Sequence, residues 1–67
     1  MMLPKHSRLI RLVTEIKSNP QQTVAGLCRT LGVAKAQLYR DKQALAAYGF
    51  VFTYSRAQRR FLIKKDP

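Results

Sequence analysis

Side chains that could bind bases and phosphates are concentrated in one short central stretch. Lys35 and Arg40 are cations, Gln37 and Gln43 are amides, and Tyr39 carries a hydroxyl on an aromatic ring. Arg40 could make two hydrogen bonds to guanine or hold a phosphate. Lys35 suits a phosphate better than a base, and Tyr39 could contact a phosphate or a thymine methyl group. If one helix presents these residues on one side, they form a surface that can lie against base edges.

These residues also have purely structural interpretations. Arg40 could be solvated and paired with Asp41, and Tyr39 could pack against the preceding helix. Lys35 and Gln37 could be ordinary surface residues. Their position at the start of a predicted helix favours the binding role, because the early turns of a recognition helix reach the bases.

A second group of cations lies closer to the C-terminus. Arg56, Arg59 and Arg60 fall in or beside a polar segment, and no acidic residue occurs between Asp41 and Asp66. A basic hairpin tip beside a helix in the major groove can reach the minor groove or the phosphate backbone. A solvated loop is the alternative, and Arg60 also fits a strand position.

The overall charge indicates a polyanionic partner. The chain has 67 residues, with 13 Lys and Arg against 3 Asp and Glu, and a formal charge of +10. Solubility needs far less charge, and self-repulsion on this scale destabilises a compact state. Nucleic acid is the first candidate partner and an acidic membrane surface the second. The hydrophobic fraction of 46% predicts a folded chain, either one small domain over residues 1–67 or a fragment of a longer protein.

The spacing of apolar residues predicts three helices, over about residues 4–18, 23–31 and 34–48. Pro20 ends the first helix, because the residue before a proline is pushed out of the helical region. Thr23 begins the second, since its hydroxyl can accept a hydrogen bond from an unpaired backbone N–H.

The same spacing assigns faces to the helices. In the third helix Leu38 and Leu45 are predicted core positions, and Tyr48 lies near the same face. The first helix is predicted to hold its cations on a solvated face: Arg8, Arg11 and Lys17. Projection of the third helix places four residues opposite its core positions: Ala36, Tyr39, Arg40 and Gln43.

After Gly49 the spacing of apolar residues changes from the helical repeat to the two-residue repeat of a strand. Residues 50–54 and 60–64 are rich in aromatic and β-branched types, which predicts a hairpin over about 50–64. A hairpin alone is marginally stable in water, so it must pack on the helices. Three helices followed by a basic hairpin is the order of a winged helix-turn-helix. The expected fold class is therefore mainly α with a small β-hairpin.

The segment from Leu38 to Asp41, followed by Leu45 and Gly49, resembles a known family. DeoR-type regulators and regulators carrying WYL domains share an N-terminal winged helix of this pattern, and the resemblance covers about residues 8–63. It implies a bacterial-type domain that binds double-stranded DNA sequence-specifically, with the third helix in the major groove. Lys42 departs from the usual apolar type, although its stem could cover the core edge while its ammonium group reaches solvent. The resemblance implies nothing about an inducer, and it leaves a homodimer open.

Other classes of function lack the residues that they need. No nucleophile–base pair, phosphate-binding glycine loop or carboxylate pair is found, so we do not expect an enzyme. Cys28 occupies a core spacing, where it is predicted to be a small apolar residue, and His6 has no partners at ligand spacing; neither a metal nor another cofactor is predicted. Because no apolar run reaches about 18 residues and no signal peptide is recognisable, we expect a cytoplasmic protein without a membrane partner.

Two further functions remain open. The same fold could be a protein-interaction module that meets an acidic partner, but such a module would favour an apolar stripe on the outward face of the third helix. An RNA-binding domain is the other alternative. It would use exposed stacking aromatics, whereas the aromatic residues here lie mostly at predicted core positions.

Overall fold

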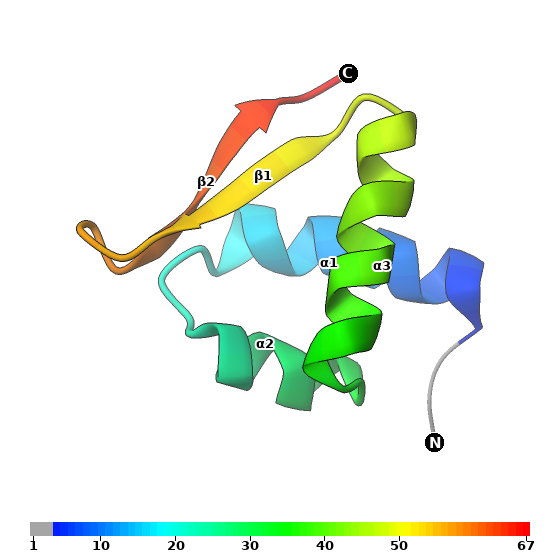
Figure 1. Cartoon of the computed structure of the whole chain (residues 1–67), viewed down its shortest axis with the longest axis horizontal. Coiled ribbons are helices and arrows are strands. Elements are labelled where there is room, and N and C mark those ends of the chain that lie inside the picture. The colour runs from blue at the N-terminus through cyan, green and yellow to red at the C-terminus, as the bar shows by residue number, and fades with distance from the viewer. Residues whose placement is uncertain (1–3) are drawn as a thin grey trace.

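Three short helices and one hairpin make up residues 4–67, the part of the chain that the computed structural model describes. They are α1 (Lys5–Ser18), α2 (Val24–Leu31), α3 (Lys35–Ala47), β1 (Val51–Ser55) and β2 (Arg60–Lys65). In Figure 1, α3 stands across α1, α2 lies below them, and the hairpin extends to the other side from the end of α3. This confirms the predicted class, mainly α with a small β-hairpin in a winged-helix layout. Residues 1–3 of the predicted domain lie outside the described residues.

Each helix begins one residue after its predicted start, because the predicted range includes the N-cap residue, and α3 also ends one residue early, before its C-cap Tyr48. The ends of α1 and α2 agree with the prediction. Thr23 is the N-cap of α2, and its hydroxyl accepts a hydrogen bond from the Gly26 N–H at 2.9 Å. Gly32 ends α2 with a φ of 69°, a conformation that favours glycine. β1 begins one residue later than predicted, because the Phe50 N–H donates to the Leu45 carbonyl at 3.0 Å and keeps Phe50 in the connecting turn.

One hydrophobic cluster holds the helices and the hairpin together. Phe52 on β1 and Phe61 on β2 bring the hairpin into it, with their ring centroids 5.9 Å apart. This packing supplies the support that an isolated hairpin lacks. The buried members of the cluster are Leu9, Leu12, Ile16, Leu27, Leu31, Leu38, Leu45, Phe50, Phe52 and Phe61.

The hairpin is also tied to the connector between α1 and α2. Its strands are antiparallel, and their pairing runs from Ser55 opposite Arg60 to Phe52 opposite Ile63 before a register shift. The Phe61 N–H donates to the Pro20 carbonyl at 2.7 Å. This hydrogen bond fixes where the hairpin lies relative to the helices, and so it also fixes the position of the basic turn.

For two side chains, the observed burial contradicts the prediction. Tyr48 is 75% exposed, because α3 ends at Ala47 and Tyr48 is its C-cap residue, so the helical projection no longer describes it. Arg8 is only 5% exposed, whereas the sequence predicts a solvated arginine. The cause is a buried partner on α3, Asp41.

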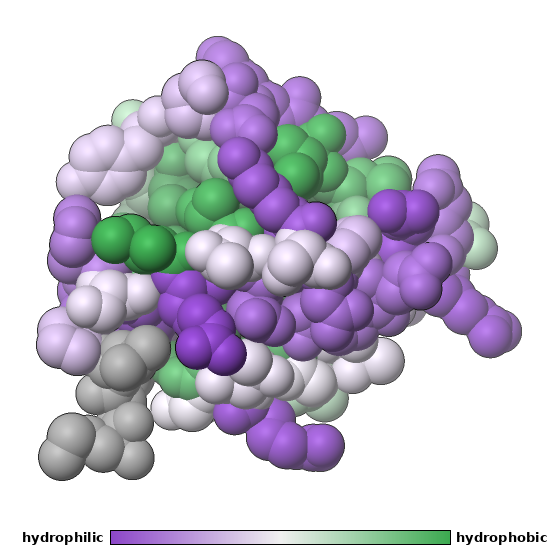
Figure 2. All heavy atoms as spheres, turned by 180° about the vertical axis from the view of Figure 1, so that it is seen from behind, coloured by the Kyte–Doolittle hydropathy of each residue, from purple (hydrophilic) through white to green (hydrophobic). Residues whose placement is uncertain are grey.

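An apolar groove lies between α1 and the end of α3. Ile10, on its edge, is 56% exposed. Figure 2, which views the molecule from behind, shows hydrophobic surface among hydrophilic side chains on this side. No lysine or arginine lines the groove, so it is separate from the basic surface. Its lining residues are His6, Leu9, Ile10, Val13, Leu45, Tyr48, Phe50, Asp66 and Pro67.

No helix in residues 4–67 combines the length and the apolar character that crossing a membrane requires.

Candidate nucleic-acid interface

The three acidic side chains all pair with cations that lie outside the hairpin turn. Asp41 pairs with Arg8, the side chain of Glu15 lies 3.4 Å from Arg11, and Asp66 lies 3.0 Å from Lys17. Of 13 lysines and arginines, these pairs use three, so ten have no carboxylate partner within the described residues. Six of those ten lie on α3 or around the hairpin turn: Lys35, Arg40, Lys42, Arg56, Arg59 and Arg60. The positive charge is therefore uncompensated around α3 and the hairpin.

The outward face of α3 agrees with the prediction. Each member of the projected set is exposed: Ala36, Tyr39, Arg40 and Gln43. Tyr39 is 57% exposed, so it does not lie buried against α2. Arg40 does not pair with its neighbour Asp41, because that carboxylate turns inward to Arg8. The guanidinium of Arg40 remains on the outward side of the helix.

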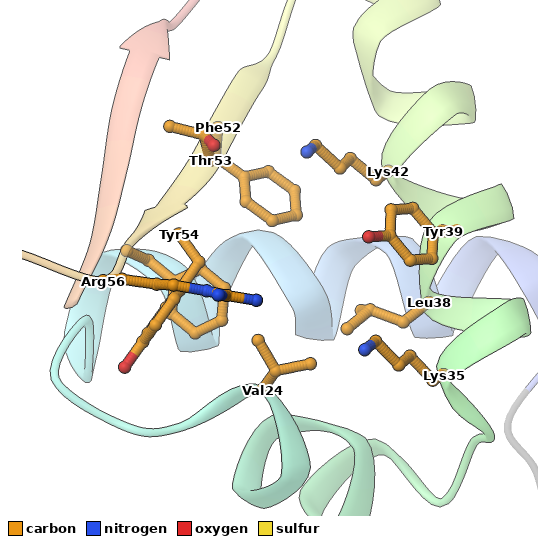
Figure 3. Close-up of a pocket in the computed structure, with 10 residues that line it drawn as sticks. Val24, Lys35, Leu38, Tyr39, Lys42, Phe52, Thr53, Tyr54 and Arg56 are labelled. Atoms are coloured by element: carbon orange, nitrogen blue, oxygen red, sulfur yellow. The ribbon is translucent and has the colours of Figure 1, made fainter. Parts of the chain in front are cut away.

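An open groove of about 220 Å³ separates α3 from the hairpin. Figure 3 shows the ammonium groups of Lys35 and Lys42 entering it from α3, together with the hydroxyl of Tyr39, and the guanidinium of Arg56 entering from the opposite side. Its apolar lining comes from core residues, among them Leu38. Cations around an apolar floor suit an anion that carries an apolar body, as a sugar–phosphate backbone does.

Lys42 shows how a cation can occupy a core-edge position. Its side chain is half-buried, and its Nζ lies 5.6 Å from the centroid of the Phe52 ring. An ammonium group at this distance is attracted to the face of the ring. The stem covers the edge of the core, as predicted, while the charge stays at the groove.

A buried ion pair fixes α3 against α1. Arg8 donates from Nε and Nη2 to the two carboxylate oxygens of Asp41, the second contact at 3.0 Å. The hydrogen bond that Arg8 donates to Asp41 is the main cause that raises the pKa of the Arg8 guanidinium. This two-point contact sets the rotation of α3, and so which side chains face outward.

Sequence reasoning missed this pair, although indications were present. Asp41 lies three residues after Leu38 and four before Leu45, which is the spacing of the buried face. An acid at such a position needs a buried cation. The partner is 33 residues away in sequence, but Arg8 lies four residues before Leu12 and eight before Ile16, so the same spacing places it beside the buried face of α1.

The remaining predicted site residues occupy different surroundings. Gln37 is half-buried and donates from Nε2 to Asp41 Oδ1 at 3.0 Å. Arg56 and Arg59 are exposed in the hairpin turn. Arg60 is the first residue of β2, and its Nε is buried without a hydrogen-bond partner among the described residues. The structure thus brings α3 and the turn together around one groove, with Gln37 on the flank of α3 that faces α1.

Arg59 has a φ of 55°, a left-handed conformation that costs a residue with a Cβ about 1 kcal/mol. Arg59→Asn is expected to raise the free energy of unfolding by roughly 1 kcal/mol, because asparagine tolerates this conformation. Urea unfolding measures this effect.

Arg56→Asn is the matched control, because Arg56 lies in the same turn without a positive φ. It should leave the free energy of unfolding nearly unchanged. If Arg59→Asn were destabilising, the backbone of the turn would not be strained at this position.

The thiol of Cys28 lies at the edge of the core. Cys28 is half-buried against the core, and burial raises the pKa of its thiol, an effect that Lys35 partly opposes. A raised pKa disfavours the reactive thiolate. Within residues 4–67, no three His, Cys, Asp or Glu side chains are grouped so that they could hold a metal ion.

Comparison of the chain with protein-family models, with curated proteins and with solved structures gives no match.

Proposed function

We propose that this chain binds double-stranded DNA sequence-specifically, as the DNA-binding domain of a transcription regulator of the DeoR or WYL-domain type. The observation that carries the proposal is the gathering of six uncompensated cations around the polar outward face of α3 and the groove beside it. A surface of this charge attracts a polyanion, and a helix of this width fits the major groove.

The proposed roles follow from position. Arg40 and Gln43, on the outward face, contact base edges together with Tyr39. The phosphates of one strand are held by the three cations that line the groove between α3 and the hairpin: Lys35, Lys42 and Arg56. The hairpin turn reaches the backbone or the minor groove beyond it, as wings do.

The alternatives fit these surfaces less well. The outward face of α3 is polar and charged rather than apolar, which disfavours a helix-groove partner there. All three phenylalanines are buried, so the hairpin offers little stacking surface to single-stranded RNA. Binding to single-stranded RNA in preference to duplex DNA would reverse this choice.

Salt dependence provides the first test. If about six phosphates are neutralised, the logarithm of the affinity for duplex DNA should fall against the logarithm of salt concentration with a slope of roughly −5. A titration of duplex DNA at several salt concentrations measures this slope. A flat response, or no binding at low salt, would refute the proposal.

Two substitutions separate base contacts from phosphate contacts. Arg40→Ala should relax the sequence preference, because it removes a contact to a base edge. Arg56→Ala should weaken binding to all duplexes alike, since it removes a phosphate contact. Selection of bound duplexes from a random pool measures both effects, and a sequence-selective loss in Arg56→Ala would reverse the assignment. A two-fold symmetric motif in the same selection would indicate binding as a homodimer.

A further inference from the structure

We infer that Asp41 is a positioning residue that turns the amide of Gln37, so that Gln37 selects a base presenting a hydrogen-bond donor in the major groove. This inference rests on the proposed function. It specifies which class of base is preferred. It also attributes that preference to Asp41, which does not itself reach DNA.

The orientation of the amide follows from the chemistry of its partner. Gln37 lies 3.0 Å from Asp41 Oδ1, four residues away along α3. A carboxylate has no proton to donate, so only the NH₂ group of the amide can face it. The carbonyl oxygen of Gln37 must then point away from Asp41. The usual ambiguity between the two ends of a glutamine amide is removed here by its neighbour.

Asp41 cannot turn away to release the amide. Arg8 donates to both of its carboxylate oxygens, and the residue is 1% exposed. A bidentate guanidinium fixes the plane of the carboxylate and keeps its charge in place. Arg8, on α1, therefore controls the orientation of a side chain in the first turn of α3.

The orientation predicts which bases are accepted. In the major groove, adenine N6 and cytosine N4 are the donors, whereas guanine O6 and N7 and thymine O4 are acceptors. The carbonyl oxygen of Gln37 pairs with the donors only, and the NH₂ group, which could otherwise pair with the acceptors, is held at Asp41. The base facing Gln37 should therefore be adenine or cytosine, favoured over guanine and thymine by roughly five-fold, the value of one hydrogen bond.

Selection of bound duplexes from a random pool, with three versions of the chain, tests the inference. The wild type should show adenine or cytosine at one position. Gln37→Met keeps the length of the side chain but removes the amide, so it should lose the preference at that position alone. The double variant Arg8→Met, Asp41→Leu replaces the buried pair with apolar residues and frees the amide. At the same position it should accept all four bases, with the rest of the motif unchanged.

Two results would overturn the inference while the proposed function stands. One is an enriched motif that Gln37→Met does not alter. The other is a double variant that keeps the full preference for adenine or cytosine. If the wild type enriches no duplex, the inference and the proposed function fail together.

A second measurement, made on the wild-type chain, tests the inference even if the double variant does not fold. In the free wild-type chain, one side-chain amide proton of Gln37 should exchange with water at least ten-fold more slowly than those of the exposed Gln43, because it is bound to Asp41. Hydrogen exchange followed by NMR detects this difference. Equal exchange rates for the two side chains would overturn the inference.

Discussion

Replacing Asp41 with alanine is expected to remove most of the stability of this chain. Asp41→Ala leaves the guanidinium of Arg8 buried without its carboxylate, which costs roughly 3–5 kcal/mol. A chain of 67 residues has a free energy of unfolding of only about 3–10 kcal/mol. Urea unfolding followed by circular dichroism measures the loss.

Two controls distinguish this effect from the loss of any ion pair. The double variant Arg8→Met, Asp41→Leu should recover most of the stability, because a buried pair can be replaced by apolar side chains of similar volume at little cost. Replacing the more exposed pair with Arg11→Met, Glu15→Leu should change the free energy of unfolding by less than about 1 kcal/mol. A cost below about 1 kcal/mol for Asp41→Ala would show that Arg8 reaches solvent or finds another acceptor.

Removing the cations of the groove is expected to have the largest effect on affinity for DNA. The triple variant Lys35→Gln, Lys42→Gln, Arg56→Gln removes three of the proposed phosphate contacts. The salt slope should become shallower by roughly 3, and the affinity at physiological salt should fall roughly 100-fold. Titrations of one duplex at several salt concentrations give both numbers.

The matched control removes the same charge from α1, in the triple variant Lys5→Gln, Arg11→Gln, Lys17→Gln. All three side chains are exposed and none lines the groove. A change in net charge alone would weaken both triple variants equally, whereas a specific site predicts a much smaller loss in the control. Equal losses would mean that the groove is not where the phosphates bind.

The predicted elements agree with the structure where the sequence information is local. The apolar spacing of Leu38 and Leu45 identified the buried side of α3, and Thr23 marked the start of α2. The period-two pattern after Gly49 identified both strands. Each of these patterns depends on residues within a few positions of one another, where helical or strand geometry sets the spacing.

The predictions failed where the outcome depends on distant residues or on the end of a helix. Arg8 looked solvated because its partner is on another helix, and Tyr48 looked buried because the projection was continued past the end of α3. The groove between α3 and the hairpin was also missed, since it exists only after Phe61 binds the connector at Pro20 and brings the turn beside the helix. Local periodicity contains no information about such contacts.

A titration of the ¹⁵N-labelled chain with a short duplex, followed by NMR, tests the central claim most directly. The backbone amide shifts should change along the outward side of α3, from Lys35 to Gln43, and at residues 56–60, which form the hairpin turn and the start of β2. The apolar groove around Ile10 and Tyr48 should be unaffected. Changes centred on that groove, or an absence of changes at low salt, would contradict the claim that α3 and the hairpin bind DNA.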